Sequence, residues 1–438
     1  MTEVRNVFLS QVLLPPISGG RPAGGINAKS EGVPSLGGEN IKSNGGMKYD
    51  DIRIIPEAFY DRMPKGILQP LDVLINKDGA QTGKVGLYDG AFEKAAVNEH
   101  LFILRAQDPE ETDQAYLFYC VLLPETQQKI YRRITGSAQP GLNSQFVRAV
   151  DIPFHTPIRQ QKIARILQTI HRAIEKTEAL IDKYQQIKAG LMHDLFTRGI
   201  GPDGQLRPPR EQAPELYQET PIGWIPKEWG VKPLKEGLDA NPKNGFSPKE
   251  VDSWQGLYAL GLSCLTKSGF KPLQLKMVPI SAISSGALIQ DGDFLISRSN
   301  TPELVGLCGI YQDVGNPAIY PDLMVRLRFD VDLDPRFIEK YLLTPFSRNR
   351  ISAIAVGTSG SMVKINGGDI KEFRVPFPSL NEQRVIVEKL EPIDREISTL
   401  ESQHAKLQKQ KAGLMHDLLT GKVTVQVEAE AESEAAHV

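Results

Sequence analysis

The chain of 438 residues lacks the features that mark exported, membrane and metal-binding proteins. Its three cysteines, Cys120, Cys264 and Cys308, are odd in number, far apart and not spaced as metal ligands. No apolar run approaches the roughly 18 residues that a membrane helix needs. The first residues, MTEVRNVFLSQ, have none of the pattern of a secretory signal. We therefore expect a reduced, cytoplasmic protein that makes no contact with a membrane.

Motifs of catalytic sites are missing too. The segment GAQTGKV at residues 79–85 resembles a phosphate-binding loop, but it has three residues between its glycines where that loop has four, and Val85 replaces the hydroxyl residue. The nucleotide-binding, zinc-protease, hydrolase and amino-methyltransferase motifs are absent, and the seven histidines are dispersed without metal-ligand spacing. The sequence thus predicts no catalytic residue, no metal site and no cofactor in this chain.

Charge is nearly balanced, with a formal net charge of −2. The exception is VQVEAEAESEAAHV at residues 425–438, which carries four glutamates and no lysine or arginine, so that the chain without it has a net charge of +2. We expect residues 422–438 to form a disordered acidic tail. Local basic clusters elsewhere could still hold phosphate groups, so the net charge alone does not exclude a nucleic-acid partner.

One octapeptide, KAGLMHDL, occurs twice, at residues 188–195 and 411–418. The match at this offset of 223 positions extends without a gap over residues 153–195, where Gln160 falls on Gln383. Apolar residues recur through both copies at alternating steps of four and three. The positions of this seam are Ile163, Leu167, Ile170, Ile174, Ile181 and Leu191, then Ile386, Leu390, Ile393, Ile397, Leu400, Leu407 and Leu414. A seven-residue apolar repeat of this length predicts a coiled coil.

We predict the two helices within residues 153–197 and 376–421, each about 38 residues or roughly 57 Å long. Pro157 can begin the first helix, and Ser379 with Glu382 forms a capping box for the second. Gly199 and Gly421 stand where chains commonly leave a helix. Inside the helices, Gly190 and Gly413 favour close packing against another backbone, the alternative being that they only loosen the last turns.

The two longer segments, residues 1–152 and 221–375, keep one order of features although few letters match. PLDVLINKDG at 70–79 parallels DGDFLISRSN at 291–300, and each is an apolar strand that ends in a polar, basic loop. Short strands followed by a late helix predict an α+β domain in each segment. Residues 198–220 are rich in proline, glycine and charge, which predicts an extended linker.

This doubled layout, together with KAGLMHDL, PFPSLNEQR at 376–384 and TPIGWIPKEW at 220–229, resembles the specificity subunit of a Type I restriction–modification enzyme. One difference is Arg159, which replaces the acidic residue before the shared glutamine. The resemblance implies two target recognition domains that read an asymmetric, bipartite site in double-stranded DNA, and two helices that pair as an antiparallel coiled coil.

The resemblance also implies the partners. Modification subunits, of which we expect two, would dock on the helices, carry S-adenosylmethionine and methylate adenine. Restriction subunits would join them and use ATP and magnesium to translocate and cut DNA. This chain would itself be non-catalytic. The open alternatives are a coiled-coil scaffold whose heads bind proteins, and a self-contained methyltransferase or nuclease, which the missing motifs disfavour.

Base reading needs side chains that donate and accept hydrogen bonds at base edges. The loops after the matched strands supply Asn76, Lys77, Gln81, Thr82 and Lys84 in the first domain and Ser297, Arg298, Asn300 and Thr301 in the second. Later polar loops add Ser137, Gln139 and Asn143, then Thr358, Ser359, Ser361 and Lys364. The alternative for each residue is an ordinary role in a solvated turn. Asn143 and Asn366 match at the common offset, so a structural role in both copies is open.

Overall fold

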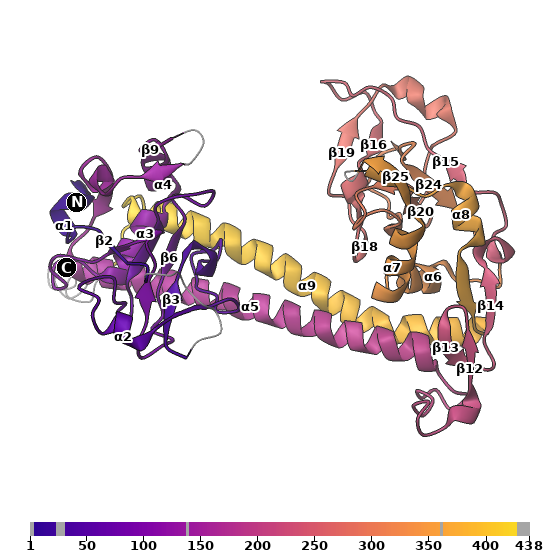
Figure 1. Ribbon diagram of the computed structural model, residues 1–438. Helices are drawn as coiled ribbons and strands as arrows, with labels where there is room; N and C mark the ends of the chain where they lie inside the picture. Colours follow the sequence, from indigo (N-terminus) through magenta and orange to yellow (C-terminus); the bar gives the residue numbers. More distant parts are fainter. Residues whose placement is uncertain (1–3, 23–30, 137–139, 360–361, 427–438) are drawn as a thin grey trace, which may run out of the picture. The chain divides into compact units, whose positions relative to one another are not determined.

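The computed structural model describes residues 4–22, 31–136, 140–359 and 362–426. The chain separates into two compact units, the first formed by residues 1–178 and 403–438 and the second by residues 179–402. Each unit contains one head of strands and short helices and one part of each of two long helices (Figure 1). The α+β class predicted for the heads is confirmed.

The first head is built on two small sheets. The larger has four antiparallel strands in the order β2-β8-β5-β6. Its strands are β2 (Ile17–Ser18), β8 (Leu101–Leu104), β5 (Val73–Asn76) and β6 (Val85–Leu87). The smaller has the order β4-β3-β7, with β4 (Arg53–Ile55), β3 (Val33–Leu36) and β7 (Ala96–Val97). Helix α3 (Gln114–Leu122) packs its buried side chains in one core with Val73 and Ile75 of β5, because alternate residues of that strand face the helix.

The second head repeats this topology strand for strand. Its four-stranded sheet has the order β15-β24-β20-β22, and its three-stranded sheet has the order β19-β16-β23. The strands of the first are β15 (Lys243–Asn244), β24 (Met324–Leu327), β20 (Phe294–Ser297) and β22 (Cys308–Ile310). Those of the second are β19 (Leu275–Met277), β16 (Tyr258–Leu260) and β23 (Ala318–Ile319). Helix α6 (Pro335–Leu342) packs against the larger sheet in the place of α3. The chain therefore contains one fold twice.

A two-stranded ribbon leads from each head into a long helix. In the first unit β1 (Arg5–Phe8) pairs antiparallel with β11 (Asp151–Phe154), which runs into helix α5 (Pro157–Arg198). In the second, β14 (Gly230–Pro233) pairs with β27 (Arg374–Phe377), which runs into helix α9 (Leu380–Leu419). The helices have 42 and 40 residues, and Pro157 begins the first, as its lack of a backbone N–H predicts.

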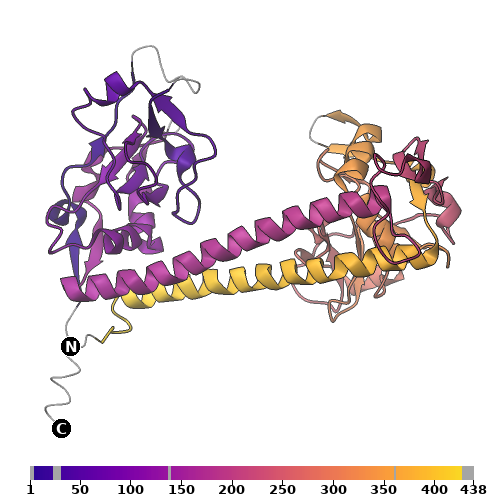
Figure 2. The same cartoon turned by 90° about the horizontal axis from the view of Figure 1, so that it is seen from below.

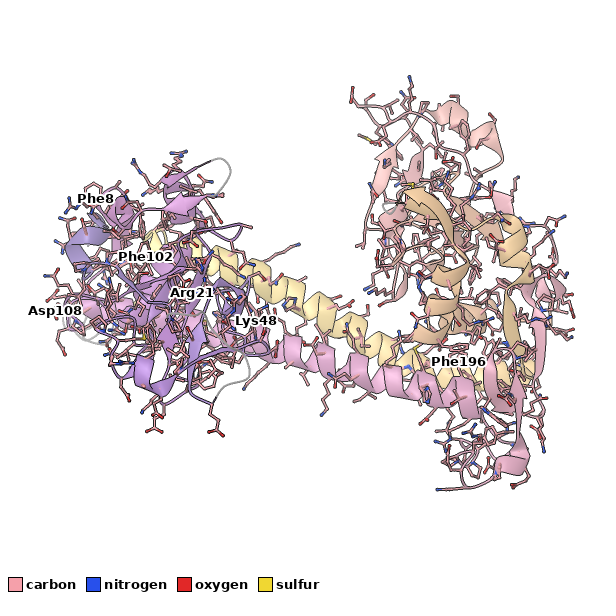
Figure 3. The ribbon with its side chains drawn as sticks, in the orientation of Figure 1. Phe8, Arg21, Lys48, Phe102, Asp108 and Phe196 are labelled. Atoms are coloured by element: carbon pink, nitrogen blue, oxygen red, sulfur yellow. The ribbon has the colours of Figure 1, made fainter. Side chains whose placement is uncertain are left out.

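Within each unit, α5 and α9 pack side by side and antiparallel (Figures 1 and 2). In the first unit Leu167 shares a core with Leu418, near the start of one helix and the end of the other. In the second unit Phe196 (Figure 3) shares a core with Ile386 and Leu390. The predicted seam residues are all buried or half-buried, with Ile163, Leu167, Ile174, Ile386, Leu390, Ile397 and Leu400 buried and Ile170, Ile181, Leu191, Ile393, Leu407 and Leu414 half-buried. An apolar seam with this pattern stabilises the pairing of two helices.

The prediction of close packing at two helical glycines is wrong. A Cβ added to Gly190 or Gly413 would meet no atom of the described residues within 4 Å. Both glycines are exposed, because the pairing of α5 with α9 buries the seam and turns this side of each helix to solvent. The repeated glycines are therefore not needed for the packing of α5 on α9.

The capping box predicted at the start of α9 is only half formed. The backbone N–H of Glu382 donates to the Ser379 hydroxyl at 3.3 Å. The Glu382 carboxylate, however, accepts from the backbone N–H of Ile200 at 2.7 Å and from the Arg207 guanidinium at 2.6 Å. This carboxylate therefore ties the segment after α5 to the start of α9.

Residues 198–220 also do not form the predicted extended linker. Ile200 bridges to Leu206, and Arg207, which is buried, bonds to Glu382 and to Glu228. The segment then forms the short helix η3 (Pro214–Leu216) and a hairpin of β12 (Tyr217–Thr220) and β13 (Gly223–Pro226). This segment, although rich in proline and charge, folds over the end of α5 and the start of α9. It is held there because the buried Arg207 needs the Glu382 carboxylate as a partner.

Candidate nucleic-acid interface

The two predicted recognition loops of the first head lie together. The loop after β5 begins at Lys77, whose carbonyl accepts from the Leu142 N–H at 2.6 Å. Two residues on, the Gly79 N–H donates to the Pro140 carbonyl at 3.0 Å. The Lys77 N–H in turn donates to the His100 carbonyl at 2.9 Å, in the turn before β8. We call residues 76–84, 98–100 and 140–143 the first corner.

The second head brings its predicted loops together in the same way. The Ile365 N–H donates to the Arg298 carbonyl at 2.9 Å, and the Arg298 N–H donates to the Leu323 carbonyl at 2.9 Å. Strand β21 (Ser299–Asn300) also pairs with β26 (Met362–Lys364). We call residues 297–301, 320–323 and 362–365 the second corner. Each corner joins the end of a central strand to the turn before its neighbour and to a late loop.

Three of the predicted base-reading residues are buried in the structure rather than exposed on a loop. Asn76, Thr82 and Ser297 are 4%, 7% and 0% exposed. The Thr82 hydroxyl donates to the Gly79 carbonyl at 2.6 Å, and the Asn76 amide donates to the Asp78 carbonyl at 2.9 Å. These side chains brace the turn after the strand, because a polar group at the end of a buried strand must find a partner nearby.

The two asparagines that match across the repeat have one structural role. The Asn143 side chain accepts from the Gln145 N–H at 3.0 Å and caps helix η2 (Ser144–Arg148). The Asn366 side chain accepts from the Asp369 N–H at 2.9 Å and caps α8 (Gly367–Glu372). The structural role that the sequence left open for this pair is therefore right. Asn143 is the last residue of the late loop in the first corner and caps the helix that follows it.

The other candidates of the two corners are exposed or half-exposed, namely Lys77, Gln81 and Lys84 in the first and Arg298, Asn300, Thr301 and Lys364 in the second. Their contact with bases stays a prediction. Thr358 and Ser359 belong to β25 (Val356–Ser359), which pairs with β26. Ser137, Gln139 and Ser361 lie outside the described residues.

Lys84 of the first corner lies within electrostatic reach of a second ammonium group, that of Lys48. Burial, and after it the charge of Lys48, lowers the pKa of Lys84. The Lys84 ammonium donates to the Gln81 side chain at 3.3 Å, so the amide of Gln81 is held beside it. Two ammonium groups that repel each other at a surface provide an attractive position for a phosphate.

A hollow of about 320 Å³ opens beside the first corner and contains residues that the sequence analysis missed. Its lining is Gly38, Glu39, Asn76, Asp78, Gly79, Ala80, Gln81 and His100. The His100 ring nitrogen Nδ1 lies 2.6 Å from the Asp78 carboxylate. His100 comes directly before β8. The sequence comparison covered only the loops that follow the matched strands; a comparison of the turns that precede them would have included His100. Donors and acceptors together at an open surface can bond to base edges.

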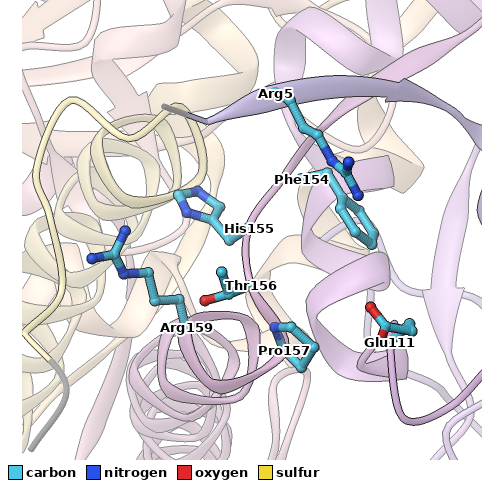
Figure 4. Close-up of a pocket in the computed structure, with 7 residues that line it drawn as sticks. All are labelled: Arg5, Glu111, Phe154, His155, Thr156, Pro157 and Arg159. Atoms are coloured by element: carbon cyan, nitrogen blue, oxygen red, sulfur yellow. The ribbon is translucent and has the colours of Figure 1, made fainter. Parts of the chain in front are cut away.

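A second hollow of the first unit, of about 220 Å³, lies at the start of α5 (Figure 4). Arg5 and Arg159 stand on its opposite sides, and the Arg5 guanidinium is 5.4 Å from the Phe154 ring centre. The His155 ring bonds to the Leu419 carbonyl at 2.9 Å, and burial lowers the pKa of His155. The His155 bond ties the start of α5 to the end of α9.

The described part of the chain lacks two features, a cluster of metal ligands and a membrane-spanning helix. No group of three or more histidine, cysteine, aspartate or glutamate side chains there could hold a metal ion. Among the same residues, no helix is long and apolar enough to cross a membrane.

Comparison with known proteins identifies the repeated unit. The family model described as the Type I restriction modification DNA specificity domain matches residues 5–185 and again residues 226–409. The chain is 24% identical over 420 residues to the Type I restriction enzyme MjaVIII specificity subunit of Methanocaldococcus jannaschii, covering 93% of this chain and 90% of that protein. It is 25% identical over 396 residues to the EcoKI specificity subunit of Escherichia coli K12, covering 86% and 78%.

A solved structure has the same fold. The S subunit of a Type I restriction–modification system from M. genitalium matches with a TM-score of 0.59 at 14% identity, over 97% of this chain and 98% of that one. The two matches to the family model account for most of the sequence, one for each copy of the repeat. The chain therefore belongs to the family of Type I restriction–modification specificity subunits.

Proposed function

We propose that this specificity subunit reads a bipartite, asymmetric site in double-stranded DNA, with one half-site for each head. The observation that carries the proposal is the pair of corners, in which one backbone arrangement presents different side chains. Lys77, Asp78 and Gly79 of the first corner correspond to Arg298, Ser299 and Asn300 of the second, of which Ser299 is buried and the others are partly exposed. Equal scaffolds with different exposed groups are suited to reading two different half-sites.

The exposed groups have the chemistry that base edges require. Arginine can make paired hydrogen bonds to guanine and asparagine to adenine, as Arg298 and Asn300 would in the second head. Lys77 and Lys84 of the first head can hold phosphates, which positions a head without reading sequence. The two halves of the site should therefore differ, with unread base pairs between them.

The helices offer two equal surfaces for partners. Ala189 and Gly190 of one octapeptide and Ala412 and Gly413 of the other are exposed, so the packing of α5 on α9 does not explain why they are identical. A partner that binds each copy would explain it. We infer that two modification subunits dock there and supply adenine methylation with S-adenosylmethionine, and that restriction subunits supply ATP-dependent cleavage. In this scheme the chain determines which DNA sequence is bound and catalyses no reaction step.

Exchange of one head tests the assignment. Residues 1–152 would be replaced by the corresponding head of another family member, and methylated adenines would be mapped in cells that also carry the partner genes. One half of the methylated site should change and the other should stay. A change in both halves, or in neither, would contradict the proposal.

The helices would set the distance between the half-sites. Seven residues inserted at matched positions of α5 and α9 should lengthen the unread spacer, because each added residue adds about 1.5 Å of helix. The readout is again the methylated site. An unaltered spacer would contradict this role, and DNA binding that does not weaken as salt rises would favour heads that bind proteins.

A further inference from the structure

A third segment joins each corner, and the sequence analysis did not include it. It follows the edge strand of the larger sheet, β2 in the first head and β15 in the second, and begins with a glycine. A Cβ added to Gly19 would lie 1.7 Å from the Val97 carbonyl oxygen, and one added to Gly245 would lie 2.1 Å from the Tyr320 carbonyl oxygen. Only glycine permits so close an approach, so both heads send the chain across the turn before β8 or β24 at the same point.

In the first head this segment carries Arg21, labelled in Figure 3. The Arg21 guanidinium lies 3.6 Å from the Glu99 carboxylate, which is also 3.5 Å from the His100 ring. Just before the segment, the Ser18 hydroxyl accepts from the Lys77 ammonium at 3.2 Å. The Arg21 side chain is 60% exposed. Arg21 is therefore held beside the first corner with its guanidinium open to solvent.

In the second head the same segment carries Phe246 and Ser247. The Phe246 N–H donates to the Tyr320 carbonyl at 2.9 Å, and the Ser247 hydroxyl bonds to the Asp322 carboxylate. The Asp322 N–H also donates to the Ser247 hydroxyl at 3.2 Å. Asp322 stands two residues before β24, as Glu99 stands two residues before β8. The acid at this position therefore holds the third segment in both heads.

Phe246 presents an apolar side chain at the surface of this segment. Its ring is 44% exposed, although the turn that holds it is fixed by backbone bonds. Its neighbour Asp322 precedes Leu323, whose carbonyl accepts from the Arg298 N–H at 2.9 Å. A phenylalanine exposed on a segment that is bonded to the second corner could meet an apolar target in the major groove, the 5-methyl group of thymine, if that corner faces DNA.

We infer that residues 20–21 and 246–247 form a third recognition segment, in which Phe246 selects a thymine through its methyl group and Arg21 selects a guanine. Glu99 orients the Arg21 guanidinium, which can then make paired hydrogen bonds to guanine O6 and N7. The inference rests on the proposed function and adds one specificity-determining residue to each head.

The test uses the whole complex with its modification subunits. Mapping of methylated adenines with the wild-type chain first defines the two half-sites. The variant Phe246→Ala should then accept other bases at one thymine of the half-site read by the second head, with the first half-site unchanged. Arg21→Gln should relax one guanine of the first half-site alone. Phe346→Ala and Arg62→Gln are matched controls, because Phe346 is 47% exposed on α7 (Pro345–Ile354) and Arg62 is exposed, bonds to the Ala58 carbonyl and is not among the residues of the first corner or the third segment.

A methyl-deletion experiment identifies the contact itself. Each thymine of the half-site is replaced in turn by deoxyuridine, which lacks only the methyl group. Wild-type binding should weaken about fourfold at one position, the value expected for one buried methyl group. The Phe246→Ala complex should show no loss there, whereas Phe246→Leu, which keeps an apolar side chain, should retain part of it.

The outcomes separate this inference from the function on which it rests. A wild-type complex that methylates no bipartite site would contradict the proposed function. A wild-type complex that methylates such a site, while Phe246→Ala keeps every base preference and no deoxyuridine weakens binding, would overturn the third segment alone.

Discussion

Gln160 and Gln383, which match across the repeat, make the same set of hydrogen bonds at the base of the two heads. The Gln160 side chain accepts from the Asp113 N–H at 2.9 Å, and Gln383 accepts from the Asp334 N–H at 2.8 Å. Each amide also donates to two carbonyl oxygens, at 3.0 and 2.7 Å for Gln160 and at 3.0 and 3.0 Å for Gln383. Both side chains are fully buried. One shared residue thus joins each long helix to the cap of the head helix beside it.

Replacement of either glutamine by leucine should destabilise its unit. Gln160→Leu or Gln383→Leu leaves a backbone N–H and two carbonyl groups without partners in the interior, which costs about 2–4 kcal/mol. The measurement is the free energy of unfolding in urea. Gln161→Leu is the control, because Gln161 is the exposed neighbour on α5. Losses equal to that of the control would show that these bonds contribute nothing.

A second pair of matched positions keeps its contact but changes its chemistry. Lys188 lies 2.6 Å from the Asp394 carboxylate in the second unit, and Lys411 lies 3.2 Å from the His171 ring in the first. Lys340 also lies 2.9 Å from Asp394. Burial alone would raise the pKa of Asp394, but the charges of Lys340 and Lys188 outweigh it and hold this pKa below its ordinary value.

The variant Asp394→Asn should therefore cost about 3–5 kcal/mol, because it leaves the Lys188 ammonium without a carboxylate in a largely buried site and leaves Lys340 with Glu339 alone. Thermal and urea unfolding at pH 7 measure this loss. Glu391→Gln provides the comparison, since Glu391 pairs with Arg336 at the exposed surface, where such a pair contributes less than about 1 kcal/mol. Equal effects of the two substitutions would disprove the importance of the buried pair.

His171 should make the first unit sensitive to mild acid. Burial, followed by the charges of Lys411 and Lys42, lowers the pKa of His171 from 6.5 to about 4. Between these values the unfolded chain binds a proton that the folded chain does not, so stability falls as the pH drops through this window. The loss should reach on the order of 2–3 kcal/mol. Unfolding free energies from pH 7 to 4.5 should fall less in His171→Gln than in the wild type or in His193→Gln, a substitution at an exposed histidine.

Lys411 should also make the stability of the folded chain increase with pH, but in the alkaline range. Burial lowers the pKa of Lys411 from 10.5 to about 8, although Glu175 and Glu178 act in the opposite direction. The folded chain loses this proton at a lower pH than the unfolded chain. The contribution of Lys411 to the free energy of unfolding therefore rises from pH 8 towards 10.5. Lys411→Met should remove that rise. A variant whose stability follows the wild-type curve over this range would show that Lys411 is not desolvated.

The sequence predicted the features that depend on local periodicity. An apolar residue at every third or fourth position fixes which face of a helix is buried, whatever the helix packs against. For that reason the apolar spacing correctly predicted one continuous helix across Pro392, which lies inside α9 although proline removes a backbone donor. The order of strands was also predicted, and the loops named after the matched strands do occupy corresponding places, at Lys77 and Arg298; that a later loop meets each of them is a finding of the structure.

Features that depend on partners distant in sequence were missed. Thr82 and Ser297 look like exposed loop residues, but their burial is decided by the late loop and by the fold of the turn. Glu382 fits a capping box, yet Arg207, 175 positions away in sequence, supplies a better partner for its carboxylate. Hydrogen-bonding groups can be satisfied locally or at a distance, and the pattern of letters does not distinguish the two cases.

Lys84 offers a direct test of the corner as a DNA surface. Burial and the neighbouring charge of Lys48 both disfavour its ammonium form, so the free protein holds positive charge there at a cost. A phosphate between the two groups would relieve the repulsion. Lys84→Gln should therefore weaken binding to all DNA sequences alike and reduce the slope of log affinity against log salt by about one.

Arg298→Ala should behave differently, because a base contact carries sequence information and a phosphate contact does not. It should relax the preference at one base pair of one half-site, at a cost of about 1–3 kcal/mol for the correct base. Filter or fluorescence binding of the assembled complex at several salt concentrations, with matched and singly mismatched duplexes, distinguishes the two. If Lys84→Gln instead altered one base preference and left the salt slope unchanged, Lys84 would be a base-reading residue and the division of roles within the corners would have to be reversed.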